Sequence, residues 1–252
     1  MTLTFLGSGT STGVPQLRCS CPTCTSTDVR DKRLRASVLL QDDGRTLLID
    51  CGPDFRFQAL REGIEHIDAL LVTHSHYDHV GGIDDLRPYT HPDGLDIYCA
   101  PDVASDLRDR MPYCFKEVLY PGVPQISLRE LRPFEPLSIA GFEVVPLPVM
   151  HYKLPILGFK IGNLAYITDA KTICRETIDA IRGIDTLVIN ALRIREHISH
   201  VNLEQALELV SQIGPRRAYL THISHDMGKH AVVDPTLPPN VHLAYDCLKI
   251  EV

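Results

Sequence analysis

One short cluster of metal-binding side chains constrains this chain more than any other feature. Four such side chains fall within six consecutive positions: His74, His76, Asp78 and His79. The apolar run at 69–73 directly precedes them, and it has the length and branched residues of a buried strand. Neutral imidazole and carboxylate are the usual ligands of zinc and related divalent ions. The sequence therefore predicts a strand that ends in a loop built to hold metal.

Composition excludes several other classes of protein. The chain has 252 residues, of which 44% are hydrophobic and 23% charged, so we expect one globular domain with a sizeable core. The net charge of −7 disfavours a broad nucleic-acid surface, because such binding depends on Lys and Arg neutralising phosphates. No apolar run reaches the length of a membrane span, and residues 1–6 are strand-like rather than a signal peptide. We therefore expect a cytoplasmic protein without a membrane partner.

The order of the predicted elements indicates two packed sheets. Hairpin turns are expected at 42–44 and 162–163, and Asn202 with Gln205 forms a capping-box pattern at a helix start. Strands are predicted at 3–6, 37–41, 46–50, 69–73, 95–99, 142–146, 156–161, 164–168, 186–190, 217–221 and 248–251. Helices are predicted at 55–62, 103–110, 174–181 and 203–212. Hairpins followed by alternating strands and helices predict two sheets face to face, with helices outside.

Further candidate ligands follow predicted strands. His151 comes after residues 144–148, Asp169 directly after 164–168, and His222 directly after 217–221. Loops at strand ends can converge on one edge of a sandwich, where polar side chains are rigidly supported yet open to solvent. Taken singly, each has a structural alternative, such as a hydrogen-bonded histidine or a helix cap. The ordered set favours ligands.

Cys19, Cys21 and Cys24 form a second cluster in a long irregular segment at 7–35. Three thiolates at this spacing can wrap one zinc ion, with a fourth ligand from elsewhere. A segment with little core of its own gains order from such a site, whereas the alternative is three free thiols in a flexible loop. Three histidines are candidates for the fourth ligand, namely His197, His225 and His230.

The whole ordered set resembles the metallo-β-lactamase superfamily of binuclear metallohydrolases, over essentially the full chain. The resemblance implies an α/β fold, a four-layer αββα sandwich, as a single metallo-hydrolase domain at 1–252 with a zinc-binding loop around 19–24. It implies two ligand groups with a shared carboxylate, namely His74, His76 and His151 for one ion, Asp78, His79 and His222 for the other, and Asp169 as the bridge. Asp50 matches a residue that braces the site. Two ions about 3.5–4 Å apart share a bridging hydroxide that is a nucleophile near neutral pH.

Three stretches narrow the resemblance to the PhnP type, the phosphoribosyl cyclic phosphate phosphodiesterases. They are the cysteine cluster and residues 82–88 and 221–226. In that type, the histidine matching His225 completes the structural zinc site, and the one matching His200 is the general acid. An imidazolium can protonate a departing alkoxide, and the neighbouring His197 is a weaker candidate. The sequence departs from the type at Cys247, where we expect glycine.

The resemblance favours a binuclear metal-dependent hydrolase of small, in particular cyclic, phosphodiesters, with His200 as general acid. A tRNA 3′-processing endonuclease shares the ligands but carries an RNA-gripping arm between the positions of His151 and Asp169, where this chain has only 17 residues. A thioester hydrolase of the glyoxalase II kind lacks the cysteine site as a rule. A metal-binding protein without activity is least favoured, because the ligand set is complete.

The expected cofactors are two divalent ions at the catalytic site, Mn or Zn, and one structural Zn. The expected partner is a small phosphodiester substrate rather than nucleic acid, and the chain is compatible with a homodimer.

Overall fold

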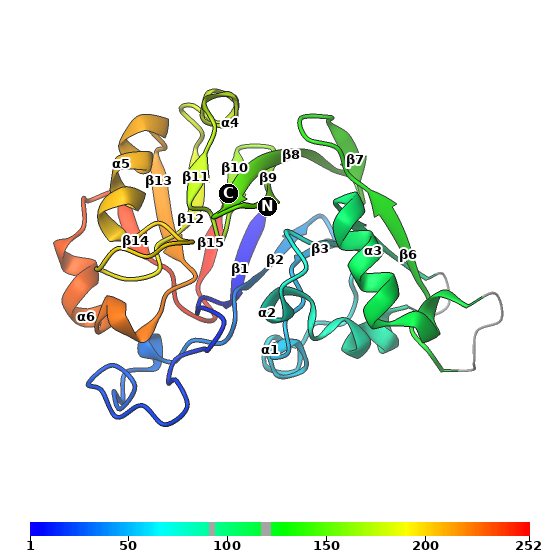
Figure 1. Cartoon of the computed structure of the whole chain (residues 1–252), viewed down its shortest axis with the longest axis horizontal. Helices are drawn as coiled ribbons and strands as arrows, with labels where there is room; N and C mark the ends of the chain where they lie inside the picture. Colours follow the sequence, from blue (N-terminus) through cyan, green and yellow to red (C-terminus); the bar gives the residue numbers. More distant parts are fainter. Residues whose placement is uncertain (91–93, 117–121) are drawn as a thin grey trace.

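The computed structural model describes residues 1–90, 94–116 and 122–252, which form two facing β-sheets (Figure 1). The first sheet has the strand order β15-β1-β2-β3-β4-β5-β6. Its strands are β1 (Thr2–Gly7), β2 (Ser37–Asp42), β3 (Arg45–Ile49), β4 (Ala69–Leu71), β5 (Leu95–Cys99), β6 (Ile126–Glu130) and β15 (Lys249–Glu251). The second has the order β11-β8-β9-β10-β12-β13-β14, with β7 paired to β8. Its strands are β7 (Leu137–Ile139), β8 (Phe142–His151), β9 (Leu154–Ile161), β10 (Leu164–Ile167), β11 (Thr172–Ile173), β12 (Thr186–Asn190), β13 (Arg217–Thr221) and β14 (Val241–Leu243).

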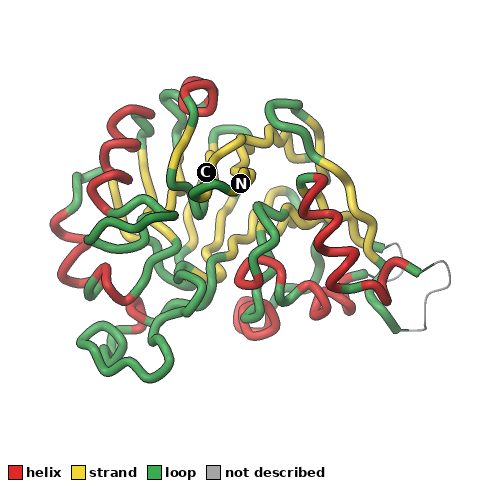
Figure 2. The backbone as a smooth tube through the Cα atoms, in the orientation of Figure 1, coloured by secondary structure: helices red, strands yellow, loops and turns green. Residues whose placement is uncertain are grey.

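Helices cover the outer faces of both sheets (Figure 2). The α-helices are α1 (Phe55–Glu62), α2 (Tyr77–Val80), α3 (Pro101–Arg110), α4 (Arg175–Ala180), α5 (Leu203–Ile213) and α6 (His230–Val233). The short 3-10 helices are η1 (Val29–Asp31), η2 (Ile83–Tyr89), η3 (Pro112–Phe115), η4 (His225–Met227) and η5 (Asp234–Thr236). No helix in the described ranges is long and apolar enough to cross a lipid bilayer.

Alternation along the strands decides which layer each side chain joins. In β1, Leu3 and Phe5 pack between the two sheets, whereas Leu6 packs under the helices of the first sheet. In β10, Tyr166 joins the core between the sheets and Ile167 joins the core under the opposite helices. Three cores therefore separate four layers, and the predicted αββα sandwich is confirmed.

Local signals located most elements but missed some strands. The capping box at Asn202 and the helix that it starts form as expected. The strand expected at 142–146 instead continues to His151, because Pro146 and Pro148 lie within it without ending it. A proline within an apolar stretch normally argues against a central strand, and for this reason the predicted strand was too short. The residues of β6, β7, β11 and β14 show no strong strand-like pattern in the sequence. They are strands because their backbone pairs with a neighbouring strand.

The topology places many strand ends at one edge. β3, β4 and β5 run parallel in the first sheet, and β10, β12 and β13 run parallel in the second. Parallel neighbours have their carboxyl ends together, and in α/β sheets that edge is where ligands bind. At the far end of the chain, Cys247 adopts φ 69°, a left-handed conformation that glycine adopts most easily. This explains why glycine suits that position.

Candidate metal centre

The loop between β4 and α2, together with α2 itself, carries four of the candidate ligands. The ring centroids of His74 and His79 lie 4.2 Å apart, and those of His74 and His76 lie 4.6 Å apart. Asp78 lies in the first turn of α2, between the two later histidines. Gly52 packs directly beneath this loop, because any Cβ there would clash with the carbonyl oxygen of Asp78. The loop is therefore held so that its imidazoles gather at one point.

Strand ends bring the remaining candidates from distant parts of the chain. His151 is the last residue of β8, Asp169 lies just beyond β10, and His222 directly follows β13. The ring centroids of His151 and His76 lie 5.1 Å apart. The Nδ1 atom of His151 lies 2.9 Å from the carbonyl oxygen of Asp169, so an N–H there leaves Nε2 to face the centre. The structure thus brings the predicted ligands together.

Three residues at this edge have a backbone conformation that side chains other than glycine rarely adopt. Asp50, Asp169 and His222 have φ values of 61°, 58° and 55°, and each sits just past the end of a strand. A left-handed residue turns the chain sharply and costs about 1–3 kcal/mol unless its surroundings hold it. Such strain concentrates at functional sites, and no local sequence pattern indicates it.

Asp169 lies at the middle of the cluster. Its Oδ2 atom is 3.2 Å from Nε2 of His79, and its Oδ1 atom is 3.1 Å from Nε2 of His222. The donor atoms of His74, His79 and Asp169 lie within 4.8 Å of one another, as do those of Asp78, His79 and His222. The two carboxylate oxygens therefore face different imidazoles, which is the placement that a bridging ligand requires.

A buried carboxylate behind the cluster orients two of the imidazoles. Asp50 Oδ2 lies 2.7 Å from Nδ1 of His79, and Asp50 Oδ1 accepts from the Thr73 amide at 2.8 Å. The Thr73 hydroxyl lies 2.9 Å from Asp50 Oδ2 and 3.0 Å from Nδ1 of His74. These contacts assign an N–H to each Nδ1 and leave each Nε2 free to bind a cation. The sequence identified Asp50 but missed Thr73.

The nitrogen atoms that face the centre fit metal ions. Nε2 of His74, of His79 and of His222 is buried and has no hydrogen-bond partner among the described residues. Buried polar atoms without a partner are costly, and divalent cations would satisfy these three together. Imidazoles combined with carboxylates are the ligands of Zn²⁺ and Mn²⁺. The residues present therefore fit a pair of divalent ions.

Electrostatics also favour a cation at this point. Burial disfavours charge on His79, but Asp169, Asp50 and Asp78 outweigh burial and raise the pKa of His79 well above its usual value. Burial and the neighbouring His79 lower the pKa of His74. The three carboxylates around His79 therefore favour positive charge at this point, which is the charge that a bound cation supplies.

His200 lies closer to the cluster than its sequence position indicates. It is 8% exposed, its Nδ1 is 3.6 Å from Asp169 Oδ1, and its ring centroid is 4.6 Å from that of His151. Burial and the adjacent His222 lower the pKa of His200 to about 3. His197 lies beside it, with ring centroids 5.2 Å apart, and contacts Ser199 rather than the carboxylates. His200 is thus the histidine that reaches the centre from this loop.

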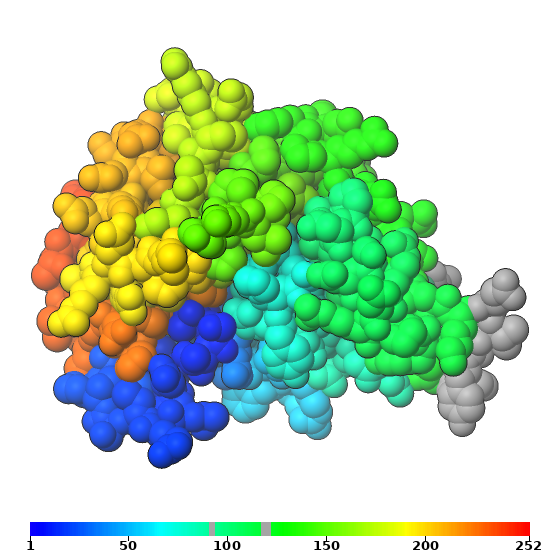
Figure 3. All heavy atoms as spheres, in the orientation of Figure 1, coloured from blue at the N-terminus to red at the C-terminus, as the bar shows by residue number. Residues whose placement is uncertain are grey.

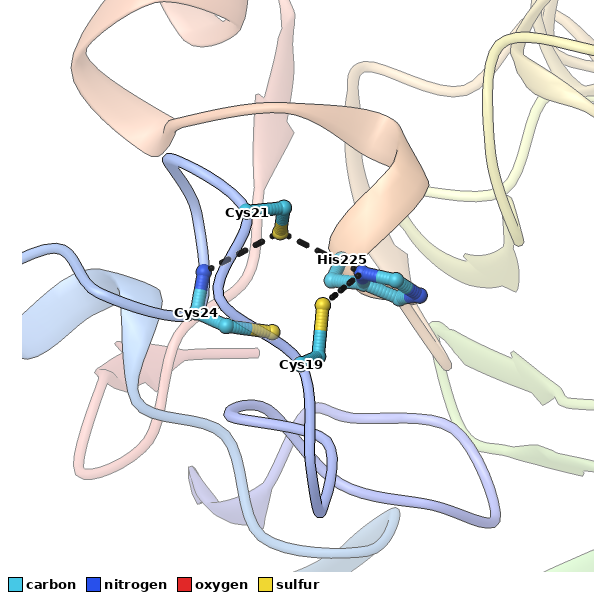
Figure 4. Close-up of side chains that lie close together, drawn as sticks. All are labelled: Cys19, Cys21, Cys24 and His225. Atoms are coloured by element: carbon cyan, nitrogen blue, oxygen red, sulfur yellow. Dashed lines mark hydrogen bonds between the residues drawn. The ribbon is translucent and has the colours of Figure 1, made fainter.

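The cysteine cluster assembles at a separate place (Figure 4). Sγ of Cys19 and Sγ of Cys21 lie 3.4 Å and 3.3 Å from Nδ1 of His225, and Cys24 completes a group with donor atoms within 4.8 Å. Of the other two candidate fourth ligands, His197 lies beside His200, and His230 packs edge-on against a tyrosine. Three sulfurs and one imidazole match a structural zinc site.

The two clusters are joined through one short segment of backbone. His222 and His225 flank the residue pair 223–224, directly after β13. The amide of Ile223 donates to Ser8 at 2.9 Å, and its carbonyl accepts from Thr10 at 3.1 Å. Residues 7–35 are therefore anchored beside the histidine and aspartate cluster without contributing a candidate ligand to it. At the same edge, Asn190 donates to and accepts from the backbone of Ala170 at 3.0 Å and 2.8 Å, which fixes the loop of Asp169.

The sequence missed Asn190 as well as Thr73. Asn190 is the last residue of β12 and Thr73 lies two residues beyond β4, both buried and at the same edge as the candidate ligands. That shared position is the signal that could have found them.

Comparison with known proteins shows which family this chain resembles in sequence and in structure. Residues 45–223 match the beta-lactamase superfamily domain. A crystal structure described as a new diphosphatase from the PhnP family superposes with a TM-score of 0.93 at 38% identity, covering 100% of this chain and 97% of that one. Zinc-bound PqqB from Methylobacterium extorquens has a TM-score of 0.81 at 21% identity, with 100% of each chain covered, and shows the fold alone.

Curated relatives have other names. An octanoyltransferase of Porphyromonas gingivalis is 47% identical over 97% of this chain, but the match covers 50% of that protein. The chain thus spans half the length of this relative. Coenzyme PQQ synthesis protein B of Methylorubrum extorquens is 29% identical, over 75% of this chain and 72% of that protein.

Proposed function

The chain belongs to the beta-lactamase superfamily and, within it, to the PhnP type, and from this premise we propose that it hydrolyses small phosphodiesters, cyclic ones in particular. Membership makes the chain a hydrolase of the metallo-β-lactamase fold. The observation that carries the finer proposal is the Asp169 carboxylate, which lies between two groups of open imidazole nitrogens with His200 beside it.

The residues divide into ligands and a proton donor. His74, His76 and His151 would hold one divalent ion, Asp78, His79 and His222 the other, with Asp169 between them. Bound there, the ions would activate a water molecule for attack and compensate the charge of the phosphate. Cys19, Cys21, Cys24 and His225 would hold a structural zinc that orders the segment at 7–35.

His200 would protonate the leaving oxygen. Its Nδ1 is buried against Asp169, so the proton must leave from Nε2. A pKa of about 3 keeps the free imidazole neutral at pH 7. An anionic phosphodiester bound beside the ring favours the charged form, so we propose that His200 gains its proton when the substrate binds.

The other functions are less well supported. β9 and β10 form a hairpin in the stretch between His151 and Asp169, so these described residues provide no RNA-gripping arm. The cysteine cluster argues against a thioester hydrolase of the glyoxalase II kind. The relative named octanoyltransferase is about twice as long as this chain, and no feature of this site favours octanoyl transfer.

A substrate panel tests the proposal directly. We expect metal-loaded protein to hydrolyse phosphoribosyl 1,2-cyclic phosphate and cyclic nucleotides, linear diesters more slowly, and thioesters at background rates. Hydrolysis of a thioester in preference to every phosphodiester would refute the proposal.

A further inference from the structure

The loop at 193–200 lies between β12 and α5 and carries His200. Its outer part is open to solvent, since Ile194 is 49% exposed and Ile198 is 67% exposed. The yellow part of the chain, to which the loop belongs, lies at the surface on the face shown in Figure 3. The described residues of the loop form no helix or strand, so contacts with the surroundings must fix where His200 lies.

No hydrogen bond among the described residues holds Nδ1 of His200, although this atom is buried. The distance of 3.6 Å from Nδ1 to Asp169 Oδ1 exceeds the length of a good hydrogen bond. Proton donation requires the ring to lie within hydrogen-bond reach of the leaving oxygen. The position of the ring therefore depends on packing and on the backbone that carries it.

The backbone on each side of His200 is tied to the metal centre. The carbonyl oxygen of Ser199 lies 2.9 Å from Nδ1 of His151. The amide of Val201 donates at 3.0 Å to the carbonyl of Ala170, in the loop after β10. These contacts fix the inner side of the loop, whereas its exposed outer side needs support from elsewhere.

Asn202 supplies that support. Its Nδ2 donates to the carbonyl of Ile194 at 3.1 Å, while its Oδ1 accepts from the amide of Gln205 at 3.0 Å as the N-cap of α5. The residue is 7% exposed. Exchanging oxygen and nitrogen would lose both hydrogen bonds, so the two contacts fix the orientation of the amide. One side chain thus caps the helix and closes the loop that carries His200.

Two backbone hydrogen bonds also close the base of the loop. The amide of Leu192 donates to Val201 at 3.1 Å, and the amide of Leu203 donates to Arg193 at 3.0 Å. Both remain when the amide of Asn202 is removed, so the fold should survive that change. The Asn202 amide adds a third bond, further along the loop toward its exposed part.

We propose that Asn202 is a positioning residue for proton donation, which holds the loop so that His200 stays beside Asp169. The inference rests on the proposed function and deepens it, because it identifies the residue that sets the place of the acid. A helix cap needs only an acceptor, which serine and aspartate supply as well as asparagine. The donor toward Ile194 is the part of this side chain that capping does not require.

Asn202→Ser separates the two roles of the side chain. The hydroxyl keeps an N-cap acceptor and lacks the donor toward Ile194. On the metal-loaded protein, we expect kcat for an alkyl phosphodiester to fall about three- to tenfold, because one net hydrogen bond is of this order. KM and metal content should stay unchanged, as should kcat for a p-nitrophenyl ester, whose leaving group needs no proton. Equal losses with both esters would overturn the inference.

The same change made in His200→Ala decides whether Asn202 acts through the histidine. A residue that only positions the ring has nothing to hold once the ring is gone, so Asn202→Ser should cause no further loss of turnover there. A further loss of similar size would show that Asn202 serves the fold rather than the acid, and would overturn the inference. This comparison also covers a variant that folds poorly, because such a defect persists without the histidine.

Gln205→Glu is the matched control. Glutamate keeps the acceptor that completes the capping box, and it keeps the contact of this side chain with Lys171, which is 3.1 Å long. The donor toward Ile194 stays in place, so both esters should be hydrolysed at normal rates. A loss confined to the alkyl ester in Gln205→Glu would assign the effect to the cap and overturn the inference.

Hydrogen exchange separates failure of the inference from failure of the proposed function. In Asn202→Ser, the backbone amides at 194–201 should exchange severalfold faster, while those of α5 keep their protection. A protein that hydrolyses phosphodiesters with the same kcat in Asn202→Ser refutes the positioning role alone. A protein that hydrolyses none refutes the proposed activity. Faster exchange then upholds the hold of Asn202 on the loop, and unchanged exchange overturns it.

Discussion

The two ligand clusters of this chain are assembled in opposite ways. The cysteine cluster takes three of its four candidate ligands from residues 19–24 of one irregular loop and the fourth from η4. The histidine and aspartate cluster takes its candidate ligands from the β4–α2 loop, from α2 and from the ends of β8, β10 and β13. The first depends on short spacing along the chain, and the second on sheets that bring distant strand ends together.

This difference predicts different roles for metal in folding. Strand pairing and buried side chains hold the histidine and aspartate cluster in place, with Asp50 and Asn190 fixing the loops behind it. The cysteine loop has few such supports, so its order should come from the bound ion. Removing metal should therefore loosen the loop and leave the catalytic scaffold standing.

The largest effect is expected from Asp169→Ala. Losing the carboxylate between the two imidazole groups removes a charge that compensates both cations, so we expect turnover to fall by about 10⁴-fold or more and both catalytic ions to be lost. Kinetics with metal analysis measures this, with Asp96→Asn, a carboxylate change on β5, as the control. Near-normal turnover with both ions bound would show that Asp169 is not the bridge.

The next effect is expected from His200→Ala, which separates proton donation from metal binding. Turnover on alkyl or ribosyl diesters should fall by about 10²–10⁴-fold at full metal occupancy. The loss should be small with a p-nitrophenyl ester, whose leaving group needs no proton. His197→Ala, the neighbouring ring, should change little. An equal loss with both kinds of ester would indicate substrate positioning, and loss of an ion would make His200 a ligand.

A smaller and local effect is expected from Cys21→Ser. The variant should lose about one zinc per chain and about 3 kcal/mol in the free energy of unfolding, as measured by metal analysis and denaturant titration. Both catalytic ions should remain, because Ile223 is hydrogen-bonded to Ser8 and Thr10 independently of the cysteines. Cys174→Ser changes an exposed thiol outside the cluster, so this control variant should lose neither zinc nor stability. Unchanged zinc content in Cys21→Ser would rule out a structural zinc site at the cysteine cluster.

The smallest effect is a pH dependence of zinc uptake by the cysteine cluster. The backbone amide of Cys24 and the ring of His225 lower the pKa of Cys21 to about 6, while burial raises that of Cys24 to about 11. Between these values Cys21 is already a thiolate and Cys24 must give up its proton when zinc binds. Calorimetry in buffers of different ionisation enthalpy should show at least one proton released at pH 8, and zinc affinity should rise with pH. No proton release would exclude Cys24 as a thiolate ligand.

The sequence predicted some strands accurately and others poorly, and the difference has physical reasons. Strands such as β5, β12 and β13 were placed with the correct bounds, because each is a short stretch of mostly apolar or aromatic residues with a glycine shortly before it. The end of β8 was misplaced, because two prolines normally stop a strand and here lie inside a long hairpin. β11 and β14 exist only because a neighbouring strand offers free backbone groups.

The sequence by itself determined the two packed sheets, the candidate ligands and the cysteine cluster, because spacing along the chain and periodicity carry that information. The family and the four-layer sandwich came from the resemblance of these motifs to a known superfamily. Only the tertiary structure decided that His200 lies 3.6 Å from Asp169 and that Thr73 links Asp50 to His74. These features join residues far apart in the chain or depend on backbone angles. Such relations arise from packing across layers, which no local pattern of residue types encodes.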